Sequence, residues 1–444
     1  MGFFKAYDMR GTFGIDFDLD VVYRVGLSLP QVVGGGRWLV GRDVRTTGEA
    51  VAGALVSGLA AAGVEVVDIG LCTTPMVYYF TAADGYNGSV MVTASHNPPS
   101  DNGLKVSKLG ALPVGYADGL NEVERMVRSM PAKCPAATDP VVSSADAAAL
   151  ERYLGFVGSI CAPLARKLKV GVDCSNGMAS LFARRMFPEA EIINDVLDGN
   201  FPAHSPNPLK GEAREQLAAL VREKRLDCGI VFDGDADRAM FVDERGNFVQ
   251  PDYLIPAVAS ACGGRAADRR VVLHDVRTSR GAIETLSERG FEPVMVPVGH
   301  AFAKPAMRKR NALCGGELAG HYYFGDFFGC DSGLIAALRV LCEFSRQDRP
   351  FSEWMAPVVS RYANSGELNF RVEDKEAAIE RVLEAGRAFG RELSRSEMDG
   401  IRVELADGWF NIRKSNTEPY LRLIVEARTQ AMLEDWVSKL SAAI

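Results

Sequence analysis

The 444-residue sequence predicts an α/β protein with mainly parallel sheets, followed by a separate C-terminal α+β domain. Short apolar runs alternate with amphipathic helical stretches through roughly the first three quarters of the chain, a rhythm typical of βαβ units. These runs lack polar alternation, so helices are expected on both faces of each sheet. In the last quarter, closely spaced strand candidates lie between two helical stretches, which indicates antiparallel pairing.

The strand candidates of the first three quarters end in polar, glycine-containing loops. Such loops at the carboxyl ends of strands are where α/β sheets bind ligands. Between the strands, residues 47–62 are a helix-length stretch rich in small residues, and residues 212–225 are charged and amphipathic. The expected strands are residues 37–40, 88–93, 169–172, 228–232 and 270–274.

The last quarter has a different pattern. Asp374 is expected to cap a helix, because apolar residues follow it at helical spacing. A second helix is expected near the C-terminus, and antiparallel strands are expected between the two at 400–405, 409–412 and 420–425. The apolar residues are Ile379, Val382, Leu383, Gly386 and Phe389 in the first helix and Leu433, Trp436, Val437 and Leu440 in the second.

Three stretches are candidate domain breaks. Residues 130–146 carry Pro131, Pro135 and Pro140 among small residues, which is typical of a linker. Further breaks are expected near 246–251 and around 350–366. The resulting domains are 1–144, 145–248 and 249–358, all α/β, and 359–444, which is α+β.

The composition excludes several classes of protein. A formal net charge of −7 gives no broad basic face for a nucleic acid or an anionic membrane. No apolar run approaches the length of a membrane span, and charges at Lys5, Asp8 and Arg10 argue against a signal peptide. The nine cysteines lack zinc-binding spacing and are expected to be reduced. We therefore expect a cytoplasmic protein without a nucleic-acid or membrane partner.

An acidic loop follows the apolar run 228–232. Asp233, Asp235 and Asp237 alternate along the chain, so their carboxylates can turn the same way. Such like charges repel unless a cation neutralises them, and oxygen ligands suit Mg²⁺ or Ca²⁺. A solvated turn is the simplest alternative. An EF-hand is rejected because Arg238 replaces the required glycine, and a haloacid-dehalogenase-type phosphatase has Thr or Val where Asp237 stands.

A serine loop follows the apolar run that begins at Gly88. Ser95 lies at the end of this run, and Pro98 and Pro99 stiffen the exit from the loop. A serine there could attack phosphorus, and its phosphate could supply an oxygen to the metal. The alternatives are a turn stabilised by Ser95 and Asn97, or a serine hydrolase, although no Gly-x-Ser-x-Gly surrounds Ser95.

Two further loops carry polar groups. Residues 315–321 place Glu317, which could accept hydrogen bonds from sugar hydroxyls, four residues before His321, which could transfer a proton or bind substrate. An ordinary glycine turn is the alternative. Between two strand candidates, a donor-rich segment suits a phosphate dianion, the alternative being a basic surface loop. This segment is Arg413, Lys414, Ser415, Asn416 and Thr417.

Taken together and in this order, the loops at 93–99, 233–238, 316–321 and 413–419 resemble those of the α-D-phosphohexomutase family, phosphomannomutase/phosphoglucomutase type. The resemblance begins at residues 7–11 and spans nearly the whole chain. It implies three α/β domains and one C-terminal α+β domain around a central active-site cleft.

The resemblance also implies residue roles. Ser95 would be the phosphorylated serine, and Mg²⁺ would be held by its phosphate with Asp233, Asp235 and Asp237. Lys105 matches the general base candidate, Arg10 and Arg238 match arginines near the transferred phosphoryl group, and His321 would assist catalysis. The substrate contacts would be Tyr7, Arg277, His300 and Glu317, with Arg413, Ser415, Asn416 and Thr417 at the second phosphate.

The implied reaction interconverts hexose 6-phosphate and hexose 1-phosphate, of mannose and/or glucose, through a hexose 1,6-bisphosphate that also serves as activator. Ser-Asn-Thr-Glu-Pro at 415–419 favours this type over glucosamine mutases, which typically have Ser-Gly-Thr-Glu-Pro. Ala319 departs from the serine usual in the family, so sugar selectivity stays open. The alternatives are a phosphoglucosamine mutase, a sugar-phosphate phosphatase or a non-catalytic sugar-phosphate-binding paralogue, and the chain is expected to be a monomer or homodimer.

Overall fold

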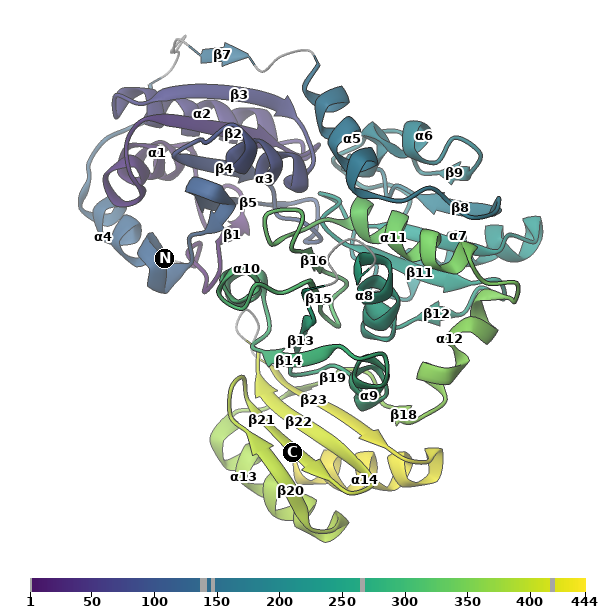
Figure 1. Cartoon of the computed structure of the whole chain (residues 1–444). Coiled ribbons are helices and arrows are strands. Elements are labelled where there is room, and N and C mark those ends of the chain that lie inside the picture. The colour runs from purple at the N-terminus through teal and green to yellow at the C-terminus, as the bar shows by residue number, and fades with distance from the viewer. Residues whose placement is uncertain (1, 136–141, 145–147, 264–267, 416–419) are drawn as a thin grey trace.

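The described residues, 2–135, 142–144, 148–263, 268–415 and 420–444 of a computed structural model, form four sheets that follow one another along the chain (Figure 1). The first three are mixed sheets with parallel centres, and the fourth is antiparallel. The predicted fold class is therefore confirmed. No helix within these ranges is long and apolar enough to cross a membrane.

The N-terminal sheet has the strand order β1-β5-β4-β2-β3-β7, with β6 paired to β5. Its helix α2 is rich in small residues because it packs closely on α1: a Cβ at Gly26 would lie 2.5 Å from the carbonyl oxygen of Leu55. The strands are β1 Met9–Thr12, β2 Arg37–Arg42, β3 Glu65–Leu71, β4 Gly88–Val92, β5 Asp101–Lys108, β6 Leu112–Pro113 and β7 Val142–Ser144. The helices are α1 Leu19–Val33, α2 Gly48–Ala61, α3 Thr74–Ala83 and α4 Asn121–Ser129.

The second sheet has the order β12-β11-β10-β8-β9, in which β8, β9 and β10 are parallel. The predicted strand at 228–232 is β10, and the residues after the acidic loop form β11. The elements are α5 Ala149–Ile160, β8 Val170–Asp173, α6 Ala183–Met186, β9 Glu191–Ile193, α7 Glu212–Lys224, β10 Cys228–Phe232, β11 Ala239–Asp243 and β12 Phe248–Val249.

The third sheet has the order β14-β13-β15-β16-β17, with β13 parallel to β14 and β15. The strands are β13 Val271–Asp275, β14 Glu292–Val296, β15 Cys314–Gly316, β16 Tyr322–Phe324 and β17 Cys330–Asp331. The helices are α8 Ile255–Gly263, α9 Arg280–Glu288, α10 His300–Lys309, α11 Gly333–Ser345 and α12 Phe351–Val359.

The C-terminal sheet has the order β18-β23-β22-β21-β20, with β19 paired to β23. Asp374 caps α13 as predicted, because its Oδ1 accepts a hydrogen bond from the N–H of Ala377 at 3.0 Å. The elements are β18 Ala363–Asn364, β19 Leu368–Arg371, α13 Lys375–Gly386, β20 Glu392–Ser396, β21 Ile401–Leu405, β22 Gly408–Lys414, β23 Tyr420–Ala427 and α14 Gln430–Ala443.

All three stretches that the sequence indicated as breaks contain regular structure, and the one near 246–251 contains β12. Residues 142–144, within the expected linker 130–146, form β7 and pair in parallel with β3. The stretch 350–366 contains α12, whose Phe351 and Trp354 rings pack against Phe344. A break was expected there, but the aromatic contacts stabilise a helix. The domain boundaries themselves stay a prediction.

Candidate active site

Ser95 lies in the loop between β4 and β5. Its φ of 52° is in the left-handed region, which residues with a Cβ seldom adopt. Its N–H donates to Oγ1 of Thr93 at 2.8 Å, and its hydroxyl donates to Oδ2 of Asp233 at 2.9 Å. The unusual backbone conformation thus accompanies a serine that meets the acidic loop of the next sheet.

Arg45 holds the serine loop in place, a role that sequence reasoning missed. The Arg45 guanidinium is buried and pairs with Asp43 at 3.2 Å. Its other partners are about fifty residues away in the sequence. No local pattern marks such a contact before the fold is known. Arg45 donates to the backbone carbonyls of Ser95, Asn97, Pro98 and Asp101.

The acidic loop approaches the serine loop closely at Gly234. A Cβ at this position would lie 2.6 Å from the carbonyl oxygen of Ser95, a separation that real Cβ atoms do not show. Glycine therefore allows the serine and the aspartates on either side of residue 234 to share one site.

The three predicted metal ligands come together. Asp233, Asp235 and Asp237 are buried, and each offers a carboxylate oxygen within 4.8 Å of the others. Among the described residues, Oδ1 of Asp235 and Oδ1 of Asp237 have no hydrogen-bond partner. Buried unpaired carboxylate oxygens are costly, and a hard cation such as Mg²⁺ satisfies them. The cluster therefore fits a divalent metal ion.

Lys105 on β5 is the nearest cation to these aspartates. Its Nζ lies 2.7 Å from Oδ2 of Asp235 and 2.6 Å from Oδ2 of Asp237. Burial alone would lower the pKa of Lys105, but the two carboxylates raise it above its ordinary value. Burial and the charges of Asp237 and Asp235 hold the pKa of Asp233 well above its usual range. Lys105 is therefore an ammonium in this arrangement.

Two arginines and a histidine surround the Ser95 hydroxyl. Arg10 pairs with Asp8 and its Nη1 donates to the carbonyl oxygen of Ala94 at 3.3 Å. Nε of Arg238 lies 3.5 Å from Oδ2 of Asp233. Nδ1 of His96 lies 3.3 Å from Oγ of Ser95. Burial, together with the charges of Arg238 and Arg10, holds the pKa of His96 well below its usual range, so this imidazole is neutral.

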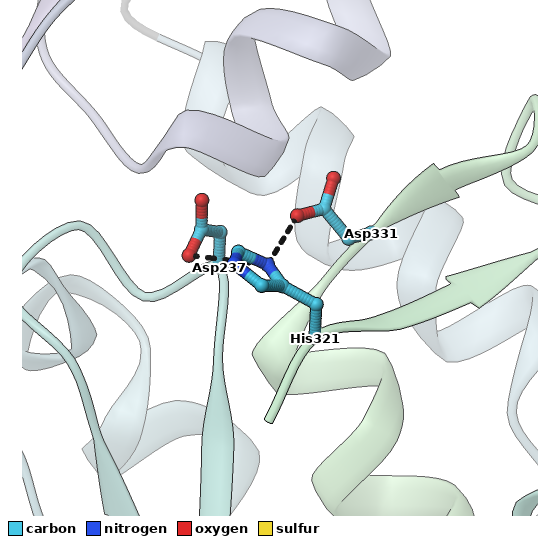
Figure 2. Close-up of side chains that lie close together, drawn as sticks. All are labelled: Asp237, His321 and Asp331. Atoms are coloured by element: carbon cyan, nitrogen blue, oxygen red, sulfur yellow. Dashed lines mark hydrogen bonds and ion pairs between the residues drawn. The ribbon is translucent and has the colours of Figure 1, made fainter. Parts of the chain in front are cut away.

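Residues 315–321, predicted to contact the sugar and called the sugar loop below, include the turn between β15 and β16 and contact the acidic loop directly. Arg238 and His321 form an isolated antiparallel bridge, and Nδ1 of His321 lies 3.7 Å from Oδ1 of Asp237. Figure 2 shows the His321 ring between Asp237 and Asp331, whose Oδ2 is 2.7 Å from Nδ1. Burial alone would raise the pKa of Asp331, but Lys304 and His321 hold it below its usual range. Asp331 was not among the predicted residues.

Glu317, in the same loop, is also buried. Its Oε1 accepts a hydrogen bond from the hydroxyl of Tyr323 at 2.7 Å, and its Oε2 lies 3.8 Å from Nη2 of Arg277. Burial raises the pKa of Glu317. The other two predicted contacts, Tyr7 and His300, form a second group with ring centroids 6.3 Å apart. Neither ring nitrogen of His300 has a hydrogen-bond partner within the described ranges.

The predicted phosphate-binding segment begins at the end of β22, which contains Arg413. Nη2 of Arg413 is 2.9 Å from Oε2 of Glu367, a carboxylate that sequence reasoning missed and that also pairs with Arg277 at 3.4 Å. The N–H of Ser415 donates to the carbonyl oxygen of Tyr420 at 2.9 Å. The predicted ligands Asn416 and Thr417 lie outside the described residues, so their roles stay predictions.

Comparisons with known proteins identify the family. Four family models match consecutive parts of the chain: phosphoglucomutase/phosphomannomutase, alpha/beta/alpha domain I at residues 1–130, domain II at 151–246, domain III at 250–362 and the C-terminal domain at 367–443. The chain belongs to the phosphoglucomutase/phosphomannomutase family.

The full-length relatives are enzymes of one kind. The chain is 38% identical over 435 residues to "Phosphohexose mutases" of Xanthomonas campestris pv. campestris, covering 97% of this chain and 96% of the relative. It is 36% identical over 462 residues to the phosphomannomutase of Vibrio cholerae serotype O1, covering 99% and 98%. A crystal structure of a family protein from Burkholderia thailandensis matches with a TM-score of 0.87 at 30% identity, covering 100% of this chain and 96% of the other. The protein is a phosphohexose mutase.

Proposed function

We propose that this mutase carries the transferred phosphoryl group on Ser95 and exchanges it between the 1- and 6-hydroxyls of mannose and/or glucose phosphates. The observation that carries the proposal is the contact of the Ser95 hydroxyl with Asp233, beside Lys105 and the other two aspartates. The wider set includes Arg10, which contacts the residue before Ser95, and Arg238, which faces Asp233, and both supply positive charge near the serine.

Asp233, Asp235 and Asp237 would hold Mg²⁺ together with an oxygen of the phosphate on Ser95. When bound, the ion neutralises charge on the phosphoryl group. The support for this cofactor is the pair of buried, unpartnered carboxylate oxygens. The N-acetylphosphoglucosamine mutase of Aspergillus fumigatus, which shares the fold at a TM-score of 0.60 and 15% identity, was solved with GlcNAc-6P and magnesium.

Each transfer breaks one P–O bond and forms another. The sugar hydroxyl bonds to phosphorus as the bond to Oγ of Ser95 breaks, which gives a hexose 1,6-bisphosphate. The bisphosphate then returns its other phosphoryl group to Ser95. In the first transfer a neutral Lys105 would take the proton of the sugar hydroxyl as that oxygen bonds to phosphorus, while Oγ of Ser95 takes up a proton as its own bond to phosphorus breaks. In the return transfer Oγ of Ser95 gives up its proton, and the Lys105 ammonium, the form that its carboxylate partners favour, gives a proton to the sugar oxygen that releases phosphorus. Arg10 and Arg238 stabilise charge on the moving group.

The sugar and its second phosphate would be bound by the third and fourth parts of the chain, with Tyr7 from the first part. Glu317 and Arg277 lie together in the sugar region, with His321 toward the aspartates, and Tyr7 and His300 form a second group. Arg413, Ser415, Asn416 and Thr417 would bind the phosphate that is not being transferred. Another A. fumigatus structure, of a variant of the same enzyme, is a complex with glucose 1,6-bisphosphate (TM-score 0.62, 14% identity).

The test is a panel of mannose, glucose and glucosamine 1-phosphates with Mg²⁺ and a trace of the bisphosphate. We expect 6-phosphate formation from mannose or glucose 1-phosphate, and loss of activity and of phosphoserine in Ser95→Ala. Ser89→Ala is the matched control, because Ser89 is buried on β4 and bonds to Thr81 away from the site. Equal activity in Ser95→Ala and wild type would refute the phosphoserine mechanism.

A further inference from the structure

Asp331 is a buried carboxylate to which no role has been assigned so far. It ends β17, and its two oxygens face two different partners. Oδ2 lies 2.7 Å from Nδ1 of His321, and Oδ1 lies 2.9 Å from Nζ of Lys304. Figure 2 shows Asp331 pointing at the His321 ring, whose Nδ1 also faces Oδ1 of Asp237 at the longer distance of 3.7 Å. Asp331 therefore accepts a hydrogen bond from the ring nitrogen and forms an ion pair with the ammonium, in which neither Oδ1 nor Nζ makes a hydrogen bond within the described residues.

We infer that Asp331 is a positioning residue that acts through His321. By accepting the Nδ1–H, it fixes the tautomer and the plane of the imidazole, and it leaves Nε2 as the ring nitrogen available to the substrate. This inference rests on the proposed function, in which His321 contacts the sugar or assists proton transfer.

Lys304 keeps Asp331 in this orientation. Lys304 lies on α10, four residues after His300, and its side chain is fully buried. Its Nζ lies 3.2 Å from the centroid of the Tyr78 ring, which belongs to α3 of the N-terminal part of the chain. A line of contacts therefore runs from Tyr78 through Lys304 and Asp331 to His321. This line links α10, which begins at the predicted substrate contact His300, to the loop that holds His321.

The same three side chains, Asp237, His321 and Asp331, also offer atoms within 4.8 Å of one another, as a metal site would. The contacts of Asp331 favour a hydrogen bond instead. Its charge is already met by the Lys304 ammonium at 2.9 Å, and a cation on the same carboxylate would be repelled by that ammonium.

The first test is the tautomer of His321, read by ¹⁵N NMR of histidine-labelled protein. The chain has five histidines, so His321→Gln identifies the signal. We expect a protonated Nδ1 in the wild type. In Asp331→Asn the amide oxygen turns toward Lys304 and the amide NH₂ faces His321, so the proton should move to Nε2. An unchanged tautomer in Asp331→Asn would overturn the inference.

The second test is kinetic. Asp331→Asn should lower kcat by about 10- to 100-fold, the range for partners that orient a functional histidine, with a much smaller change in KM. Removing the ammonium as well, in Lys304→Met/Asp331→Asn, frees the amide oxygen to accept the Nδ1–H. The double variant should therefore recover the tautomer and part of kcat. It also avoids a buried unpaired lysine if the single variant folds poorly. Equal loss of kcat in both variants would contradict the positioning role.

The matched control is Asp173→Asn. Asp173 makes a second buried contact of this kind, with Oδ2 3.0 Å from Nε2 of His204, and neither residue belongs to the proposed site. This variant should shift the His204 signal and leave kcat within about twofold, as expected for an independent site. If the wild type formed no 6-phosphate, the proposed function would fail while the NMR experiment still decided the tautomer. If turnover were normal and the tautomer unchanged, only the inference would fail.

Discussion

Replacing Glu367 by Gln should both destabilise the protein and strengthen its binding of phosphate. Glu367 faces Arg413 and Arg422 at 2.9 Å and Arg277 at 3.4 Å. Burial alone would raise its pKa, but the three arginines lower it from 4.5 to about 2. At about 1.4 kcal/mol for each pKa unit, the ionised carboxylate contributes on the order of 3 kcal/mol to the free energy of unfolding.

The pH dependence of this contribution to stability follows from the lowered pKa of Glu367. The contribution is fully present above the unfolded pKa of about 4.5 and is lost as the pH falls through the folded value of about 2. Glu367→Gln should therefore cost on the order of 3 kcal/mol at pH 7, and the difference from wild type should narrow between pH 5 and pH 3. Urea unfolding measures this difference. Glu189→Gln is the control, because Glu189 forms an exposed pair with Lys167 worth about 0.5 kcal/mol or less.

The same change should act on substrate. Glu367 neutralises Arg413 and Arg277, so its carboxylate competes with a phosphate for these guanidinium groups. If freeing them is worth about 1 kcal/mol, KM for hexose phosphate and the inhibition constant of inorganic phosphate should fall about fivefold. A variant as stable as wild type at pH 7, or one with a raised KM, would refute the reasoning that Glu367 occupies the position of a phosphate.

Two further predictions follow from the site and the third sheet. Gly234→Ala should separate the serine and acidic loops, because its Cβ would lie 2.6 Å from the Ser95 carbonyl oxygen, and this separation should weaken activation by Mg²⁺. Gly53→Ala is the control: its Cβ would lie in open space, so activation should be unchanged. Burial raises the pKa of Asp252 to about 7, so the folded state binds more protons between about pH 4 and 7 and stability falls as the pH rises; urea unfolding of Asp252→Asn should lack this slope.

The sequence predicted the strands that precede the serine and acidic loops because the signals for these strands are local. The apolar run before Asp233 and the one before Ser95 can each be recognised as a strand that leads into a polar loop within about ten residues of sequence. Arg45, Asp331 and Glu367 carry no such signal, since their roles depend on partners brought close by the fold. A lone charged residue in a sequence is usually solvated, and only burial beside a specific partner distinguishes these three.

The packing separates the phosphate loop from the rest of the site. One apolar cluster runs through the first three sheets, whereas the C-terminal sheet has its own core. The contacts across this boundary are one small apolar cluster, in which Leu318 packs with Trp409 and Ile424, and several polar contacts. Among the polar contacts, Arg402 donates to the carbonyl oxygens of Val276 and Thr278, and Arg280 pairs with Glu404. Polar contacts of this kind break at lower cost than a shared apolar core. The serine, acidic and sugar loops are thus fixed to one another, and we expect the C-terminal part to move when its arginines exchange Glu367 for a substrate phosphate.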